Sequence, residues 1–287
     1  MKKIFFLIII VTLSFYSCKS NYTKVGDKNQ NYVPYYLSVD KAKKAYDKGE
    51  HEKTFFLLDS LFNHYEPIQT LFINELDIYC ELALKFKNKK KVKKIMYILV
   101  DEYGSNLSNY NNKFWPELKQ FSGISDKKLK EKFNKFNSNI NYNVRDSLTQ
   151  MLFYDQKYRI EKNIVKSDSI DKENEKKLRF IFKKYGYPTQ KLIGGHIEGN
   201  EYKLSTLSVL LKHISLSFFN EIQPFLLDEL KKGKCPPVIY GGMVDHKIVV
   251  DSDIIPFTYY ATYRNVPPTD KKATNEARLK IGLPAIE

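Results

Sequence analysis

Short catalytic motifs are absent from this chain of 287 residues. It has no Gly-x-Ser-x-Gly turn, which exposes the nucleophile of many hydrolases, and no His-Glu-x-x-His zinc motif. A Gly-x-x-x-x-Gly-Lys phosphate loop is missing as well. The sequence therefore gives no support to a serine hydrolase of the usual kind, a zinc peptidase or a nucleotide-dependent enzyme.

Long apolar runs are also missing. A helix needs roughly 20 apolar residues to cross a bilayer whose hydrocarbon core is about 30 Å thick, and the run at residues 4–13 is too short. This run follows two lysines and leads to Ser17-Cys18, an order that is typical of a cleaved bacterial lipoprotein signal. We expect that residues 1–17 are removed and that acylated Cys18 ties the protein to a membrane.

Two alternatives stay open for this leader, because Phe15 stands where a lipoprotein signal prefers leucine. One is an ordinary cleaved signal in which Cys18 is incidental, and the other is an uncleaved anchor. The lipoprotein prediction places the rest of the chain in the cell envelope, as an outer-membrane lipoprotein that faces the periplasm or the cell surface.

Cysteine is scarce, with three residues in the chain. If Cys18 is acylated, only Cys80 and Cys235 are left, and their spacing does not indicate a disulfide even in an oxidising compartment. Cys80 lies in an apolar helical pattern, so we expect a buried free thiol there.

Acidic residues are outnumbered, which gives a formal net charge of +14. A basic surface attracts polyanions, but an exported protein meets no nucleic acid, and we expect no such partner. Anionic lipid or lipopolysaccharide head groups are more plausible partners for a lysine cluster around a predicted turn, and a plain solvated turn is the alternative. The cluster consists of Lys85, Lys87, Lys89, Lys90, Lys91, Lys93 and Lys94.

The hydrophobic periodicity predicts a mainly α fold. Residues 18–37 are polar and suit a tether. Residues 38–104 have helical spacing, and the segment 49–54 resembles the turn of a tetratricopeptide repeat, so we expect N-terminal helical hairpins. Residues 105–143 are rich in Asn, Ser and Lys and are predicted to connect the two halves.

Residues 144–287 are predicted to form a C-terminal helical domain. β-Branched and aromatic residues gather at 247–250 and 257–262, which favours one small β-hairpin on this helical body. The expected helices cover about 144–165, 169–185, 201–219 and 222–232.

The second half also carries a set of short motifs. They are Asp155-Gln156 with Arg159, then Tyr185-Gly186-Tyr187-Pro188, His213, Asp245, and Arg278 with Ile281-Gly282-Leu283-Pro284. By these residues, positions 144–287 resemble the bacterial domain of unknown function 6624. That family is itself uncharacterised, so the resemblance implies no reaction.

The chain departs from the family pattern at several positions. Lys212 and Ser215 stand where the family tends to have Gln and Asp, and His246 stands where Arg is usual. Phe257-Thr258-Tyr259-Tyr260 replaces a Gln and a Tyr-Gly-Thr-Gln run. If the family has an active site, these departures imply that this member has lost part of it.

Four residues are the candidates for catalysis, namely Asp155, Arg159, His213 and Asp245. Asp155 and Arg159 are four apart on one predicted helix, so Arg159 is placed to bind an anion that Asp155 orients or deprotonates. The plain alternative is an exposed ion pair that stabilises the helix by about 0.3 to 0.5 kcal/mol. His213, among Leu and Phe, then belongs to the core.

Three histidines and Asp245 are of the types that bind zinc. Their spacing matches no compact metal motif, and we predict neither a metal site nor a cofactor. The histidines are His196, His213 and His246.

Three functions fit the sequence. The favoured one is a non-catalytic lipoprotein whose helical hairpins bind a protein or another component of the envelope. The second is an envelope hydrolase in which Asp155, Arg159, His213 and Asp245 converge on one cleft. The third is an immunity-type lipoprotein that neutralises a toxin from competitors. The oligomeric state is left open by the sequence.

Overall fold

The computed structural model describes residues 22–28, 30–70, 73–105, 114–194, 206–251, 258–263 and 266–287. Within these ranges the chain is mainly helical, as the periodicity predicts, and no strand is formed. None of the described helices combines the length and apolar character that a membrane crossing requires. Cys18 and His196 lie outside the described residues.

The described helices run from α2 to α14. They are α2 (Val33–Asp47), α3 (His51–His64), α4 (Glu75–Lys85), α5 (Lys89–Tyr103), α6 (Trp115–Ser122), α7 (Asp126–Asn139), α8 (Tyr142–Ile160), α9 (Ile164–Tyr185), α10 (Gln190–Ile193), α11 (Thr206–Leu210), α12 (Leu216–Lys231), α13 (Pro237–Asp251) and α14 (Lys271–Lys280).

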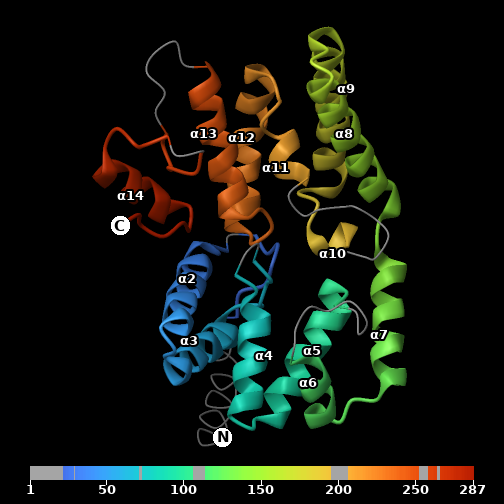
Figure 1. Ribbon diagram of the computed structural model, residues 1–287, viewed down its shortest axis with the longest axis vertical. Coiled ribbons are helices and arrows are strands. Elements are labelled where there is room, and N and C mark those ends of the chain that lie inside the picture. The colour runs from blue at the N-terminus through green and yellow to red at the C-terminus, as the bar shows by residue number, and fades with distance from the viewer. Residues whose placement is uncertain are drawn as a thin grey trace, which may run out of the picture.

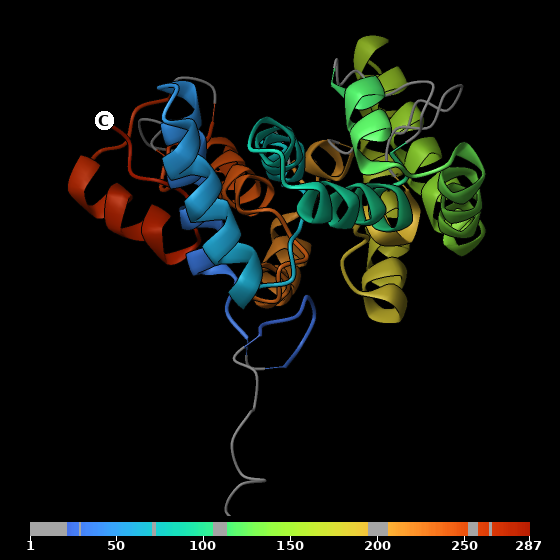
Figure 2. The ribbon, with the colours of Figure 1, turned by 90° about the horizontal axis from the view of Figure 1, so that it is seen from below.

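The helices lie at two levels along the long axis of the molecule (Figure 1). Helices α2 to α6 occupy the lower level, and α8, α9, α11, α12 and α13 occupy the upper one, with α7 leading up into α8. Helix α2 packs on α3, α4 on α5, and α8 on α9. Seen from below, α14 runs beside α2 on the side away from α8 and α9 (Figure 2).

The apolar residues of both levels form one continuous buried cluster, from Tyr32 to Leu283. Gly233 is where the turn after α12 meets the start of α2. Its φ is +80°, and a Cβ there would lie 2.9 Å from ring atoms of Tyr32, so both the backbone conformation and the space favour glycine. The close contact joins the C-terminal half to the N-terminal helices.

The predicted tether is shorter than expected. Helix α2 begins at Val33, with Pro34 in its first turn, where the missing N–H costs nothing. Tyr32 and Tyr35 are fully buried and their rings pack at 5.4 Å between centroids. Aromatic burial therefore draws residues that look polar and irregular into the core.

The segment predicted as a connection contains two helices, α6 and α7. Trp115, Leu118 and Leu129 from these helices are buried in the common core. Ser125 caps α7 by accepting a hydrogen bond from the backbone N–H of Lys128. Residues 105–143 are mostly polar, but a few apolar residues at helical spacing are enough to pack α6 and α7 on the core.

The predicted β-hairpin is not seen among the residues that the structure describes. Residues 247–250 form the last turn of α13, and Lys247 donates a hydrogen bond of 2.7 Å from its ammonium to the carbonyl of Ile214. Residue 257 is outside the described residues, and Thr258 makes only an isolated bridge with Pro268. Packing of α13 against α11 and α12 overrides the β propensity of its Ile and Val residues.

Two predicted helices break where polar caps occur. Helix α8 ends at Ile160 rather than near 165, because Lys162 has a φ of +55° and Asn163 caps α9. The expected helix over 201–219 is interrupted after Leu210, and Ser215 caps α12 by accepting from the N–H of Phe218. His213 therefore lies in a turn.

Both described cysteines are buried and free, as expected for Cys80. Burial raises the pKa of both thiols, so Cys80 and Cys235 are poor nucleophiles at neutral pH.

Candidate functional site

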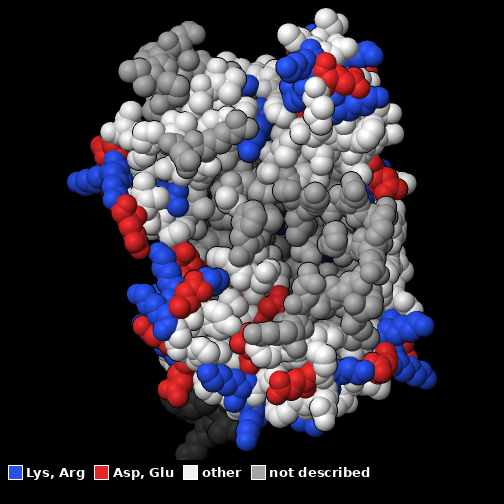
Figure 3. All heavy atoms as spheres, in the orientation of Figure 1, with Lys and Arg blue, Asp and Glu red and all other residues white. Residues whose placement is uncertain are grey.

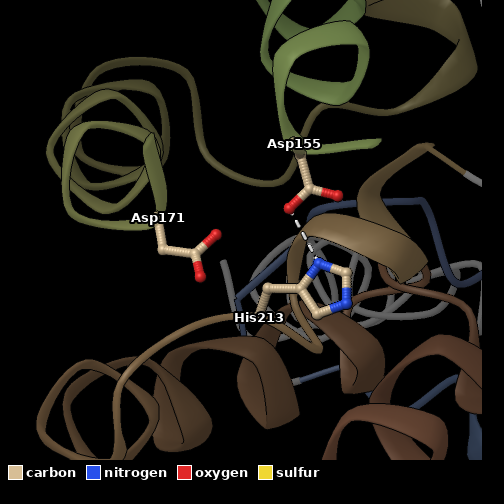
Figure 4. Close-up of side chains that lie close together, drawn as sticks. All are labelled: Asp155, Asp171 and His213. Atoms are coloured by element: carbon tan, nitrogen blue, oxygen red, sulfur yellow. Dashed lines mark hydrogen bonds and ion pairs between the residues drawn. The ribbon is translucent and has the colours of Figure 1, made fainter. Parts of the chain in front are cut away.

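Three of the four candidate residues meet near the upper end of the molecule. Asp155 and Arg159 come from α8, and His213 comes from the turn between α11 and α12. Figure 4 shows Asp155 facing His213. His213 Nδ1 lies 2.8 Å from Asp155 Oδ1, and Arg159 Nη2 lies 3.3 Å from the same oxygen. Asp155 is fully buried, whereas the side chains of Arg159 and His213 are 31% and 22% exposed. The cluster is thus anchored in the interior and open to solvent on one side.

Asp171 completes the cluster from α9. Arg159 Nη2 lies 2.7 Å from each carboxylate oxygen of Asp171, so this guanidinium bridges two carboxylates on neighbouring helices. Asp171 is not among the residues predicted from the sequence, because no local spacing shows which face of the predicted helix 169–185 packs against Asp155. The helix break at Asn163 brings Asp171 opposite Asp155 across the α8–α9 pair.

The ring nitrogens of His213 have different surroundings. Nδ1 lies between Asp155 Oδ1 at 2.8 Å and Arg159 Nε at 3.1 Å, and it can donate to the first or accept from the second, but not both. The shorter contact, to a buried carboxylate, favours the tautomer with the proton on Nδ1. Nε2 points away from both carboxylates (Figure 4). A neutral His213 of this tautomer presents an acceptor lone pair at Nε2.

Burial and neighbouring charges shift the pKa values of the two carboxylates in opposite directions. Burial of Asp155 acts against its charged form, but the hydrogen bond from His213 and the charge of Arg159 outweigh burial, and the pKa of Asp155 lies below its usual value. Burial and the nearby Asp155 raise the pKa of Asp171, although Arg159 acts against this shift. Asp155 is therefore the carboxylate that stays ionised beside His213.

The same cluster has the donor types of a metal site, because ligand atoms of Asp155, Asp171 and His213 lie within 4.8 Å of one another. Two carboxylates and an imidazole are suitable donors for a divalent metal. The Arg159 guanidinium, however, already bonds both carboxylates. The charge of the carboxylates is therefore already balanced by Arg159, and a metal would have to displace this side chain.

Asp245 does not join this cluster. Its carboxylate is fully buried and accepts from the N–H groups of Tyr259, Tyr260 and Thr262, at 2.7 to 2.8 Å, and from the Thr262 hydroxyl at 2.6 Å. Arg278 supports the same segment by donating to the carbonyl of Tyr260. Asp245 therefore holds residues 259–262 in place.

The neighbour of Asp245 does approach the cluster. The ring centroid of His246 lies 6.2 Å from that of His213 and 5.2 Å from that of Tyr263, in edge-to-face arrangements. From the sequence, His246 stood out as a residue type that binds metal and as a departure from the family pattern, which usually has Arg there. The structure instead places it as the aromatic neighbour of His213.

Another buried carboxylate, Glu75, lies in the N-terminal half. Glu75 Oε2 accepts from the backbone N–H and the hydroxyl of Thr70, at 3.0 and 2.7 Å, and Oε1 lies 3.1 Å from the Tyr35 hydroxyl. Burial raises the pKa of Glu75 to about 7, because these partners are neutral. Glu75 holds the irregular segment before α4.

The motif Tyr187-Pro188 lines a small cavity of about 90 Å³ between the two halves. Lys191 lies at this cavity and pairs with Glu66 at 2.7 Å and with Glu102 at 2.5 Å. Because the charge of Lys191 is already balanced, the cavity offers no free cation to a ligand through this residue. The motif residues therefore act at the junction of the halves and not at the Asp155 cluster.

Comparison with known proteins gave no match: no family model, no curated protein and no solved structure is similar to this chain. The resemblance of residues 144–287 to the domain of unknown function 6624 stays a prediction that depends on the short motifs alone.

Proposed function

We propose that the chain is a membrane-anchored lipoprotein of the cell envelope and that Asp155 and His213 form the acid–base centre of a hydrolase-type enzyme. The observation that carries the enzymatic part is the 2.8 Å contact between His213 Nδ1 and the buried Asp155 carboxylate. An imidazole oriented in this way by a carboxylate is the usual arrangement of a general base.

The chemistry follows from the free nitrogen of His213. Nε2 accepts a proton from a water molecule as the water oxygen attacks the electrophilic carbon or phosphorus of the substrate. The same nitrogen then returns that proton to the leaving group, so no proton is gained or lost overall. Asp155 stabilises the imidazolium that exists between the two transfers, and Arg159 and Asp171 hold Asp155 in position.

A panel of chromogenic esters, amides and phosphodiesters tests this proposal in the full chain. We expect hydrolysis of at least one class, with a loss of about 10²-fold or more in His213→Gln and in Asp155→Asn. His64→Gln is the matched control, since the His64 side chain is exposed and its ring nitrogen Nδ1 lies 2.8 Å from the carbonyl of Ser60 in the same helix. Equal rates in His213→Gln and His64→Gln, or no hydrolysis of any class, would contradict an enzymatic role.

The anchor depends on Cys18. Metabolic labelling with palmitate is expected to mark the wild-type chain and not a Cys18→Ser variant. Unlabelled wild-type chain, or chain with an intact leader in the cytosol, would overturn the proposed location.

A binding function has its own supporting observation. Lys90, Lys91 and Lys94 line a hollow of about 250 Å³ beside the start of α5, together with Asp59. Lys91 pairs with Asp59, which leaves Lys90 and Lys94 as the cations at its rim. Recovery of the same envelope component by the wild type and by a Lys90→Glu/Lys94→Glu variant would contradict binding through this hollow.

A further inference from the structure

Large apolar side chains are exposed at one end of the molecule. Ile160, Ile164 and Val165 flank the α8–α9 turn and are 78%, 74% and 80% exposed. This turn is the highest point of Figure 1 and extends beyond the neighbouring helices. Leu216 at the start of α12 and Val250 near the end of α13 are also more than half exposed. Helices α12 and α13 belong to the same upper level as α8 and α9 in Figure 1. Exposed apolar residues that gather in this way mark an interaction surface.

Lysines surround the three apolar side chains of the turn. Lys157, Lys162 and Lys166 are all exposed. The ammonium groups of Lys157 and Lys166 lie 5.9 and 5.3 Å from the centroid of the Tyr158 ring. In Figure 3 uncharged atoms form the outermost part of this end, and basic and acidic side chains lie directly below them. An apolar projection is thereby formed, and three lysines and two acidic residues, Glu161 and Asp168, are exposed beside it in the sequence.

We propose that this projection, Ile160, Ile164 and Val165 with Lys157, Lys162 and Lys166, docks on a lipid bilayer that contains anionic head groups. Branched apolar side chains at a protruding turn can enter the boundary between head groups and acyl chains. The lysines can then reach the phosphates while their stems stay in apolar surroundings.

The lysines favour a bilayer over a protein partner. Lysine is depleted at the centre of protein–protein interfaces, where aromatic residues and arginine are enriched. On an anionic membrane each lysine near the surface contributes about 1 kcal/mol to binding. The surface is also convex, whereas an apolar helix in a protein complex usually lies in a groove.

Docking does not depend on the acid–base role of His213, although the two features are neighbours. Arg159, which holds Asp155, directly precedes Ile160. A docked projection would therefore bring the candidate site close to the head groups of the bilayer. Failure of the hydrolysis assay would leave the docking proposal intact, and the reverse also holds.

Position-specific fluorescence tests the proposal in the full chain. In a Cys18→Ser background, Val165→Cys is labelled with an environment-sensitive nitrobenzoxadiazole dye, while Cys80 and Cys235 are buried. Phe56→Cys is the matched control, since Phe56 is a 72% exposed aromatic residue on α3, in the lower part of Figure 1. Any binding through the leader affects both proteins equally, so the difference between the two positions reports docking.

We expect a blue shift and an intensity rise of about twofold or more at position 165 with vesicles of phosphatidylcholine and phosphatidylglycerol, and no change at position 56. Lys162→Glu/Lys166→Glu in the labelled protein should abolish the rise, because it reverses the charge beside the turn. Equal responses at the two positions, no response at 165, or the same response with phosphatidylcholine alone would overturn the proposal.

Discussion

Asp155 and Glu75 are both fully buried carboxylates, yet their surroundings differ in charge. Asp155 faces a histidine and an arginine that are partly exposed, and its pKa is lowered. Glu75 faces a threonine and a tyrosine in a closed network, and its pKa is raised to about 7. Burial penalises the charged form in both places, and the charge of the partners decides the sign of the shift.

This contrast distinguishes the candidate acid–base site at Asp155 from the structural role of Glu75. Glu75 can lose its charge without leaving a cation unpaired, because its partners are neutral. Loss of the Asp155 charge would instead remove one of the two carboxylates that Arg159 bonds and the acceptor beside His213 Nδ1. Asp155 contacts the partly exposed imidazole of His213, a group that can carry a proton between the cluster and solvent.

The largest effect on stability is expected from removal of the Asp155 carboxylate. Asp155→Ala should lower the free energy of unfolding by about 3 kcal/mol, the lower end of the range for a broken buried pair. Arg159 keeps Asp171 and is partly exposed, which limits the loss. Urea denaturation at pH 7 measures it, and Asp155→Asn, which retains the shape, should lose less. A change below about 1 kcal/mol in Asp155→Ala would show that the pair is not formed.

Glu75 should make the free energy of unfolding fall as pH rises, whereas the contribution of Asp155 is lost as pH falls. Its pKa in the folded state, about 7, lies above the usual value, so the folded state binds the extra proton. Stability should therefore fall by about 3 kcal/mol as pH rises from about 4.5 to about 7 and then level off. Glu75→Gln should remove this fall when urea midpoints are compared across that range.

Asp155 contributes in a different pH window. Because its pKa in the folded state is lowered, its contribution is present above the usual carboxyl pKa and is lost as pH falls through the lower, folded value.

A Glu75→Gln variant that keeps the wild-type slope between pH 4.5 and 7 would contradict the assignment of that slope to Glu75.

Asp245 provides a third case, in which the carboxylate accepts hydrogen bonds from neutral backbone N–H groups and a hydroxyl. Asp245→Asn replaces one acceptor oxygen by an amide that faces the N–H groups of the 259–262 segment. We expect a loss of about 2 kcal/mol, measured by urea denaturation, with the contact between Asp155 and His213 unchanged. Loss of hydrolysis together with retained stability would instead return Asp245 to the catalytic site.

Local patterns predicted the parts of the site that depend on one element. Asp155 and Arg159 share a face because residues four apart on a helix do so. The meeting of Asp155 with Asp171 depends on the helix break at Lys162-Asn163, which the sequence predicts a few residues too late, between 165 and 169, and on the packing of the two helices. The helical state of residues 247–250 depends on packing and on the Lys247 contact with Ile214, which β propensity cannot reveal.

The mainly α fold followed from periodicity, whereas the burial of Tyr32 and Tyr35 did not. Polar neighbours and Pro34 made these tyrosines look like part of a tether. Their rings are buried by contacts with residues distant in sequence, such as the 2.9 Å hydrogen bond from the Tyr35 hydroxyl to the carbonyl of Ile68. Such contacts leave no local pattern in the sequence.

The tautomer of His213 is the most direct test of the proposed acid–base centre. Nitrogen-15 NMR of the histidine side chains in the full chain, assigned by comparison with His213→Gln, distinguishes a protonated ring nitrogen from a bare one. We predict that neutral His213 carries its proton on Nδ1, bonded to Asp155, and has a bare Nε2. A proton on Nε2, with Nδ1 accepting from Arg159 Nε, would contradict the proposed centre.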